Sequence, residues 1–248
     1  MDRLVMGLLG SLSFVFGLTF AFFLMYRRHL RRLRREDQAR ERAGRASIPR
    51  RRPGSYPLPA RWVAIHTVNS VAVREALSVP SPGIPWSEAL ARSKERAWFV
   101  SPPVDGWTLV IGGRLPDAAQ DVDRVYRFLA KLSQEFGEVH FYSADRVLNF
   151  HAWAQWDRGR VVRAYAWTGE TVWTEGRLTV EERLLGLRCR EYGEAPEPVR
   201  YGEIPPEVHN TERVGLLARR WSVDLLAASE ILLQQEVVES EDDDETRD

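Results

Sequence analysis

Two runs of aromatic and β-branched residues decide the fold: RVLNFHAWAQW at 146–156 and RVVRAYAWT at 160–168. Residues of these types favour strands, and together the two runs are long enough for a pair of full-length strands. Asp157, Arg158 and Gly159 separate them. A two-residue turn at Arg158 and Gly159 predicts that the two runs form an antiparallel hairpin.

The register that this turn implies places large side chains on one surface of the hairpin. The expected facing pairs are Trp156 and Val161, Ala154 and Arg163, Ala152 and Tyr165, and Phe150 and Trp167. The other surface then carries His151, Trp153 and Gln155 beside Val162, Ala164 and Ala166. Because both surfaces are partly apolar, we expect helices to cover one and other parts of the protein to cover the second.

Shorter elements flank the hairpin on both sides. Further strands are expected at 61–68, 97–101, 107–112, 138–143 and 171–174, and helices at 69–77, 85–95, 118–136 and 179–187, from 210, and from 222 to 233. Asp117 and Asn69 are the expected caps of their helices, Gly137 ends the longest one, and Thr179 with Glu182 forms a capping box. Since no regular βαβ repeat is present, the fold class predicted for 61–235 is α+β, a mixed, mostly antiparallel sheet with packed helices.

The N-terminus predicts a different kind of structure. Leu4 to Tyr26 form 23 residues without a charge, and at about 1.5 Å per residue such a helix crosses a hydrocarbon core of about 30 Å. A cleaved secretory signal and a buried core helix are the alternatives. The first has a shorter apolar region and a cleavage site with small residues, whereas here Met25 and Tyr26 lead directly into Arg27. Residues 1–26 are therefore predicted to be a single transmembrane anchor.

The charges beside this span predict its orientation. Six arginines within ten positions form a membrane collar after it: Arg27, Arg28, Arg31, Arg32, Arg34 and Arg35. The positive-inside rule places them, and everything that follows, on the cytoplasmic side of the cytoplasmic membrane, with the N-terminus outside. The single cysteine, Cys189, excludes an internal disulfide and agrees with a reducing compartment.

The net charge of zero conceals two charged ends. The chain has 35 basic and 35 acidic residues, yet 27–52 holds twelve arginines against three acids, a net of +9. The segment 236–248 holds eight acids against one arginine, a net of −7. We expect 27–60 to be an Arg-rich juxtamembrane segment and Pro-rich linker, and 236–248 to be a disordered acidic tail. The arginine segment lacks interleaved aromatic residues, so lipid is a better expected partner for it than nucleic acid.

Motifs for catalysis and cofactor binding do not emerge from the sequence. No glycine-rich phosphate loop or nucleophile elbow occurs, and no two histidines have the spacing of zinc ligands. Asp121 and Asp123 fit the first turn of a helix, and Cys189 has no identified base. We therefore expect no catalytic residue, metal or cofactor.

These observations favour a membrane-anchored domain that binds a protein partner in the cytoplasm or associates with itself, with immunity to a toxin as a special case. The candidate contact residues, chosen because Trp, Tyr and Arg are favoured at interfaces, are His151, Trp153, Trp156 and Arg163. The alternative is a membrane-tethered enzyme whose site combines His140 and His151. A concave site with both histidines and a carboxylate favours the enzyme, and an exposed flat aromatic face favours binding.

Overall fold

A computed structural model describes residues 59–79, 84–194 and 206–245, with side chains placed as far as Glu236. All of these residues belong to one compact unit, Pro53–Asp248. The predicted anchor at 1–26, the six collar arginines and the linker up to residue 58 lie outside the described residues. Among the helices in the described ranges, none combines the length and apolar character of a membrane span.

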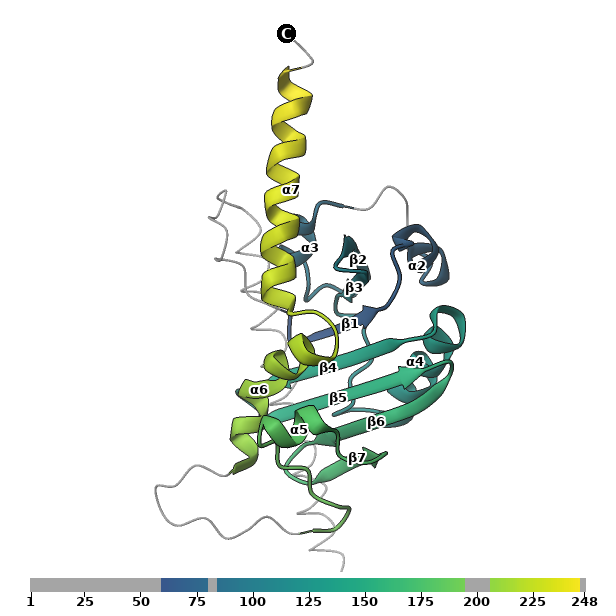
Figure 1. Ribbon diagram of the computed structural model, residues 1–248, viewed down its shortest axis with the longest axis vertical. Coiled ribbons are helices and arrows are strands. Elements are labelled where there is room, and N and C mark those ends of the chain that lie inside the picture. Colours follow the sequence, from purple (N-terminus) through teal and green to yellow (C-terminus); the bar gives the residue numbers. More distant parts are fainter. Residues whose placement is uncertain (1–58, 80–83, 195–205, 246–248) are drawn as a thin grey trace, which may run out of the picture. The chain divides into compact units, whose positions relative to one another are not determined.

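One sheet organises the described residues. It has seven strands in the order β2-β3-β1-β4-β5-β6-β7, and every neighbouring pair is antiparallel. The strands are β1 (Arg61–Ile65), β2 (Phe99–Val104), β3 (Trp107–Ile111), β4 (Val139–Asp145), β5 (Phe150–Asp157), β6 (Arg160–Trp167) and β7 (Thr171–Glu175). The predicted α+β class with an antiparallel sheet is thus confirmed (Figure 1).

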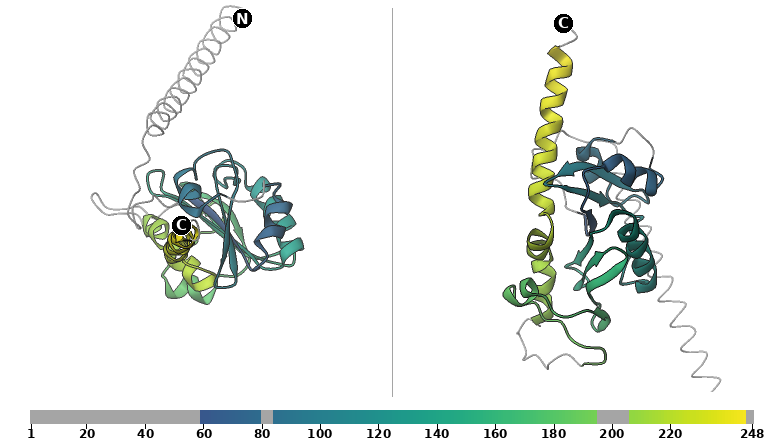
Figure 2. Two further views of the ribbon diagram at one scale, coloured as in Figure 1. Left: turned by 90° about the horizontal axis from the view of Figure 1, so that it is seen from above. Right: turned by 45° about the vertical axis from the view of Figure 1, so that its right-hand side comes forward.

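Helices pack on both faces of this sheet. They are α2 (Ser70–Ala76), α3 (Trp86–Ala91), α4 (Val122–Phe136), α5 (Val180–Leu184), α6 (Pro206–Trp221) and α7 (Leu225–Glu245). The right-hand view of Figure 2 shows the sheet between α4 on one side and the column of α6 and α7 on the other. We call the two surfaces the α4 face and the α6 face.

Each face has its own hydrophobic core because side chains alternate along every strand. The α4 face buries Val63, Phe141 and Trp156 against Val125 and Leu129 of α4. On the α6 face, the buried strand residues include Trp62, Trp107, Tyr142, Trp153 and Tyr165, which pack with Val214 and Leu217 of α6. Both faces are therefore covered, and most of the large aromatic residues lie inside the domain.

The longest predicted helix starts later than expected. Asp121, rather than Asp117, caps α4 by accepting a hydrogen bond from the Arg124 N–H at 2.9 Å. Asp117 instead forms an ion pair with Arg61 at 2.6 Å, and its side chain accepts from the Ala119 N–H. A carboxylate that already has these partners is not placed to cap the helix. The caps predicted at Asn69 and at Thr179 with Glu182 are confirmed.

The hairpin turn is confirmed, but the register beyond it is wrong by one residue. Arg158 and Gly159 both have positive φ, 48° and 77°, and Trp156 pairs with Val161 as predicted. Gln155 then pairs with Arg163, so Val162 is an extra residue in a β-bulge. The predicted pairs Ala154–Arg163, Ala152–Tyr165 and Phe150–Trp167 are replaced by Ala154–Ala164, Trp153–Tyr165, Ala152–Ala166 and His151–Trp167.

This bulge moves three large side chains to the other face. Arg163, Tyr165 and Trp167 lie on the α6 face with Trp153, whereas the register without a bulge placed them with Trp156. A glycine later in the chain leaves room for the bulge. A Cβ on Gly176, whose φ is 76°, would lie 2.2 Å from the Val162 carbonyl oxygen, so the bulged carbonyl fits only against a glycine.

The C-terminal helices also differ from the prediction. α6 begins at Pro206 instead of Asn210, and α7 continues to Glu245, past the expected start of a disordered tail at 236. Glu236 is part of the folded domain, because its carboxylate accepts from the backbone N–H groups of Trp86 and Ser87. These are free donors of the first turn of α3, where a carboxylate is stabilised. The predicted boundary between 235 and 236 therefore falls inside a helix.

Candidate functional site

A carboxylate between two histidines forms the first polar cluster of the α6 face. Glu138 lies between the end of α4 and β4, and its side chain is 35% exposed. Its two oxygens contact His66 Nδ1 at 3.2 Å and His140 Nε2 at 3.1 Å. The His66 N–H also donates to the Glu138 carbonyl oxygen at 3.0 Å. The antiparallel pairing of β1 with β4 thus brings these residues together from distant parts of the sequence.

Polar contacts continue from His140 into the domain. The Tyr142 hydroxyl lies 3.3 Å from His140 Nδ1 and 2.9 Å from the Ser222 hydroxyl. His140 Nε2 lies close to the Glu138 carboxylate but is not aligned for a hydrogen bond with it, whereas Nδ1 is within hydrogen-bond distance of Tyr142. The Ser222 hydroxyl also donates to the Ala218 carbonyl oxygen at 3.2 Å, so these contacts connect the end of α6 with β4. We call Glu138, His66, His140, Tyr142 and Ser222 the Glu138 cluster.

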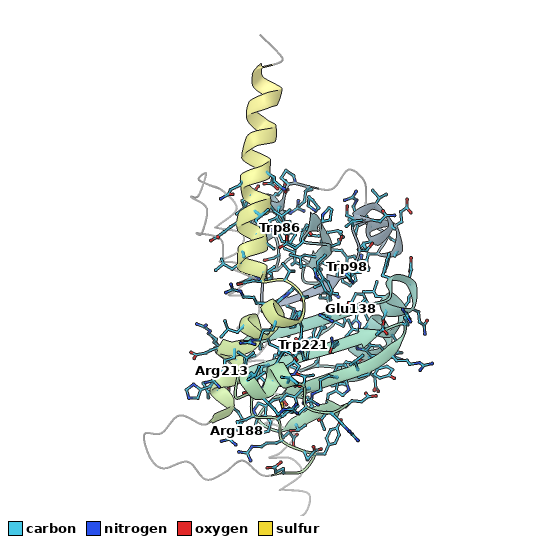
Figure 3. All side chains as sticks on the ribbon, in the orientation of Figure 1. Trp86, Trp98, Glu138, Arg188, Arg213 and Trp221 are labelled. Carbon is cyan, nitrogen blue, oxygen red and sulfur yellow. The ribbon has the colours of Figure 1, made fainter. Side chains whose placement is uncertain are left out.

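Two tryptophans pack against the histidines of this cluster. The ring of Trp107 lies 4.7 Å from that of His66 and 5.0 Å from that of His140, measured between centroids. Trp221, at the end of α6, lies 5.9 Å from the His140 ring (Figure 3). His140 is therefore surrounded by aromatic rings except where it meets Glu138 and Tyr142.

This environment determines the protonation states. Burial lowers the pKa of His140, and the adjacent Glu138 carboxylate opposes that shift only in part. The close polar contact with His140, followed by the charge effects of both histidines, lowers the pKa of Glu138. Burial also raises the pKa of Tyr142. At neutral pH the cluster thus contains an ionised carboxylate, a neutral buried imidazole and a protonated phenol.

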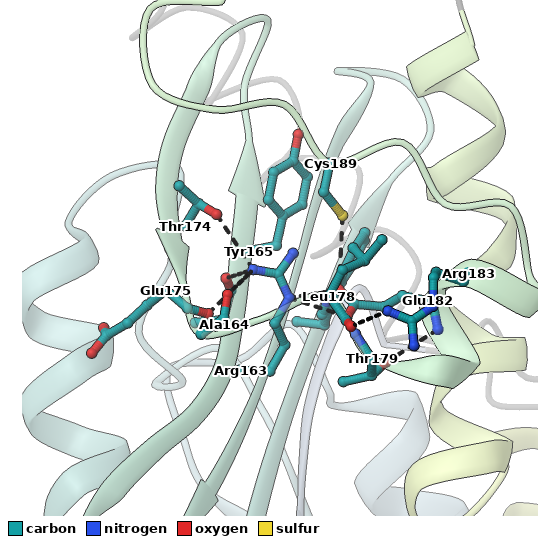
Figure 4. A network of polar contacts seen from close by, with 12 residues as sticks. Arg163, Ala164, Tyr165, Thr174, Glu175, Leu178, Thr179, Glu182, Arg183 and Cys189 are labelled. Atoms are coloured by element: carbon teal, nitrogen blue, oxygen red, sulfur yellow. Dashed lines mark hydrogen bonds and ion pairs between the residues drawn. The ribbon is translucent and has the colours of Figure 1, made fainter.

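The Glu182 cluster is the second polar group on the α6 face, and it is sealed (Figure 4). Glu182 Oε1 accepts from Trp153 Nε1 at 2.7 Å and from Arg163 Nε at 2.8 Å. Its other oxygen accepts from the Thr179 N–H at 2.7 Å, which completes the capping box of α5. The side chains of Arg163 and Glu182 are 3% and 0% exposed. The Glu182 carboxylate therefore caps α5, neutralises the buried Arg163 and accepts a hydrogen bond from the indole N–H of Trp153.

Cys189 borders the Glu182 cluster as a weakly acidic thiol. Its Sγ lies 3.7 Å from Glu182 Oε1, to which the thiol donates. Burial and then the charge of Glu182 raise the pKa of Cys189 to about 12, despite the opposing effect of Arg163. Because the thiolate is the nucleophile, this cysteine is unreactive in the folded protein.

His151 belongs to a third group, at the contact between β5 and α6. Its Nε2 lies 3.1 Å from the amide nitrogen of Asn210, and its Nδ1 lies 3.3 Å from the Thr211 hydroxyl. The ring is stacked with Trp153 and Tyr165. Burial lowers the pKa of His151 to about 3, so both ring nitrogens serve as hydrogen-bonding groups of a neutral imidazole.

The two histidines of the predicted enzyme site do not meet. Both lie on the α6 face, but His140 pairs with Gln155 while His151 pairs with Ala144. The four positions between His140 and Ala144 along β4 correspond to roughly 13 Å at about 3.3 Å per residue. His140 does have a carboxylate beside it, and its second histidine is His66 rather than His151.

The four predicted contact residues lie inside the domain. His151, Trp153 and Trp156 are fully buried, and Arg163 is 2% exposed. Three of them are on the α6 face, whereas Trp156 is on the α4 face with its ring edge toward Tyr126. They cannot contact a partner in this conformation, because helices cover both faces of the sheet. Their assignment as surface contacts is therefore not supported.

Sequence reasoning missed the residues that organise both clusters. Glu138 was only the start of a strand, His66 had no assigned role, and Glu182 was only a helix cap. The one available signal was that Glu138 and His140 stand two apart in a predicted strand and thus on one face. Pairing of β1 with β4 is non-local, so nothing in the sequence placed His66 beside them.

Among the described residues, no group of three or more histidine, cysteine, aspartate or glutamate side chains is arranged to hold a metal ion. Glu138 contacts each of its two histidines through a different carboxylate oxygen. Comparisons with protein-family models, curated proteins and solved structures found no match to this chain.

Proposed function

We propose that this protein is a single-pass membrane protein whose α+β domain lies in the cytoplasm and binds a protein partner without catalysing a reaction. The observation that carries the proposal is the uncharged run Leu4–Tyr26 followed at once by six arginines, from Arg27 to Arg35. An apolar run of this length is typical of a membrane span, and the arginines favour a cytoplasmic domain.

The chemistry of the domain supports a binding role. Cys189 has a raised pKa, both ring nitrogens of His151 have hydrogen-bond partners, and the Arg163–Glu182 pair is closed to solvent. Each of these groups has a structural task in the folded domain. Groups that already have protein partners are poorly suited to exchange protons or bonds with a substrate.

The surface formed by α5 and α6 is our candidate for the partner contact. Val180 and Leu184 stand four apart on α5 and are 55% and 67% exposed, and Leu216 of α6 is 49% exposed. α5 packs against α6, and Arg213 fixes that contact by donating to the carbonyl oxygens of Leu185 and Gly186. Exposed aliphatic side chains on two contacting helices suit a protein partner with an apolar surface.

Orientation can be tested separately from binding. Single cysteines at exposed positions such as Arg158 and Val68, in a Cys189→Ala background, are treated in intact cells with a membrane-impermeant thiol reagent. We expect no labelling until the membrane is permeabilised. Labelling in intact cells would place the domain outside and overturn the cytoplasmic assignment.

Binding is tested by cross-linking the full chain in its native membrane and comparing Leu184→Asp with the matched control Val68→Asp. We expect a cross-linked protein that is captured by the wild type and the control but lost with the α5 variant. A cross-linked product consisting of two copies of this chain would identify self-association as the contact. Equal capture by both variants would refute the α5 and α6 surface.

The Glu138 cluster favours one alternative function, a membrane-tethered enzyme that uses Glu138 and His140 as acid and base. The specific observation is a half-exposed carboxylate whose oxygen lies 3.1 Å from Nε2 of a buried, neutral imidazole, since such residues are recurrent acids and bases. The test is turnover of ester, phosphate-ester and glycoside substrates by the full chain. The alternative requires an activity that Glu138→Gln abolishes while Glu170→Gln retains it.

A further inference from the structure

The two ends of the sheet differ in what they expose. At one end, β1 begins and its neighbours β3 and β4 end, since Arg61 pairs with Ser143 and Trp62 pairs with Ile111. We call this the Arg61 end. β5 starts there as well, because it runs antiparallel to β4, and Figure 1 shows the arrows of β1 and β5 pointing the same way. The 58 residues that precede the described domain join it at this end.

The β4–β5 turn at the Arg61 end has an apolar tip. Val147 is 93% exposed and Leu148 is 72% exposed, and Arg146 beside them is exposed too. The turn is well defined, because Asp145 Oδ1 accepts from the N–H groups of Val147 and Leu148 at 2.9 and 3.0 Å. Two aliphatic side chains are therefore held in solvent by a hydrogen-bonded turn.

Basic residues surround this end of the sheet. Lys94 and Arg96 are exposed in the segment before β2, and Arg114 is exposed in the segment after β3. The two segments are joined by hydrogen bonds from the N–H groups of Gly113 and Arg114 to the carbonyl oxygens of Glu95 and Ala97. Glu170, in the β6–β7 turn, is an exposed acid at the same end. Asp117, which pairs with Arg61, and the exposed Asp121 and Asp123 at the start of α4 are further acids at this end. The Arg61 end thus combines an apolar tip with exposed basic residues and with acids.

The β5–β6 hairpin, at the opposite end of the sheet, lacks this combination. Its corresponding turn, between β5 and β6, is formed by Asp157, Arg158, Gly159 and Arg160, which are charged residues and a glycine. Asp157 and Arg158 approach each other at 4.0 Å. The apolar tip is therefore not a general property of the hairpins in this domain.

We propose that the Arg61 end docks on an anionic lipid surface, with Val147 and Leu148 entering the head-group region and Arg146, Lys94, Arg96 and Arg114 contacting lipid phosphates. This inference rests on the proposed membrane anchor. The chain that leads to the anchor joins the domain at this end, so tethering presents this end to the bilayer at high local concentration. Aliphatic side chains beside basic ones are the combination that binds the interface of anionic membranes.

The test uses the full chain in lipid nanodiscs that hold one copy each. Leu148→Cys, in a Cys189→Ala background, carries an environment-sensitive fluorophore, and an identical label at Arg158→Cys serves as the matched control at the opposite end. The discs contain phosphatidylcholine alone or mixed with phosphatidylglycerol. In the anionic discs we expect a blue shift of the residue 148 label and quenching by brominated lipids, with neither effect at residue 158.

The charge requirement is tested with Arg96→Glu and Arg114→Glu, which lie away from the label. The two substitutions together are expected to abolish the shift, as is high salt, which screens exposed charges. A water-like emission of the residue 148 label in anionic discs would overturn the proposal. A shift that arises only in discs with two chains would also overturn it, by assigning the tip to self-association.

Failure of the anchor would be recognised independently. A chain without a transmembrane span does not co-purify with the discs of phosphatidylcholine alone, whatever the state of its label in the anionic discs. A chain that co-purifies with the discs but keeps its label in water retains the proposed anchor and loses only the docking surface.

Discussion

Two glutamates on the α6 face have opposite environments. Glu182 is completely buried and its carboxylate holds an arginine, a tryptophan and a helix N-terminus. Glu138 is partly exposed and holds two histidines at the rim of the sheet. Both carboxylates bridge segments far apart in sequence, yet only the Glu138 carboxylate is in contact with solvent. The comparison shows that one carboxylate joins a strand to a helix inside the core, whereas the other joins two strands at the solvent-exposed rim.

The largest effect is expected from breaking the sealed cluster. Glu182→Ala leaves the Arg163 guanidinium buried without its counter-ion, and removing one partner of such a pair typically costs about 3–5 kcal/mol. Chemical unfolding of the full chain in detergent, followed by tryptophan fluorescence, measures this loss. Glu170→Ala, at an exposed carboxylate, is the matched control and is expected to change stability by less than about 0.5 kcal/mol. Equal effects would mean that the sealed pair does not stabilise the domain.

Thiol reactivity tests the same sealed region without a mutation. The raised pKa of about 12 for Cys189, against an ordinary value of 9.0, lowers the thiolate fraction at mildly basic pH by a factor on the order of 1000. A coloured disulfide reagent should therefore react far more slowly with the folded chain than with the chain in denaturant. Since Cys189 is the one cysteine in the sequence, the signal has a single source. Rapid labelling of the folded chain would contradict the environment described for this thiol.

Acid should destabilise the domain through His151. Its pKa is about 3 in the folded state against an ordinary 6.5. Burial of the neutral imidazole is therefore fully compatible with folding above about pH 6.5, and the free energy of unfolding decreases as the pH falls below that value. Each pH unit below about 6.5 lowers the free energy of unfolding by about 1.4 kcal/mol, so the loss between neutral pH and about pH 5 is about 2 kcal/mol. Unfolding curves at several pH values measure it. His151→Gln, which retains hydrogen-bonding groups without titrating, should flatten this dependence.

The smallest effect is expected in the Glu138 cluster. Ser222→Ala removes one hydrogen bond to Tyr142, whose hydroxyl keeps His140 as a partner, so the expected cost is about 1 kcal/mol. The informative measurement is the pKa of His140 by NMR. Without the Ser222 hydroxyl, the Tyr142 phenol has only His140 as a side-chain partner, so a change in their contact alters that pKa. A cost as large as that of Glu182→Ala would show that the two networks are equally tightly coupled to folding.

The sequence predicted the parts of the fold that depend on neighbouring residues. The turn at Arg158 and Gly159 and the capping box of Thr179 with Glu182 rely on local hydrogen bonds and backbone preferences, and both are confirmed. The bulge at Val162 was not predictable in this way. It depends on a close approach to Gly176, in the segment after β7, and a one-residue shift moves every following side chain to the opposite face.

The candidate sites were less predictable than the fold for the same reason. The bulge carries Arg163 to the α6 face, where it meets Glu182, and β1 inserts between β3 and β4 to carry His66 to Glu138. Aromatic richness alone indicated an interface at Trp153 and Trp156. In the folded domain those rings fill the two cores, because a two-sided sheet needs large apolar side chains on both faces.

The contact between Glu236 and the start of α3 has a consequence for biosynthesis. The carboxylate that caps Trp86 and Ser87 lies 150 and 149 residues later in the chain. Synthesis proceeds from the N-terminus, so α3 leaves the ribosome long before its cap exists. The N-terminal end of α3, in the first third of the domain, therefore lacks this cap until α7 has left the ribosome. A ribosome stalled before Glu236 would hold a chain whose sheet strands are all present but whose α3 is not yet capped.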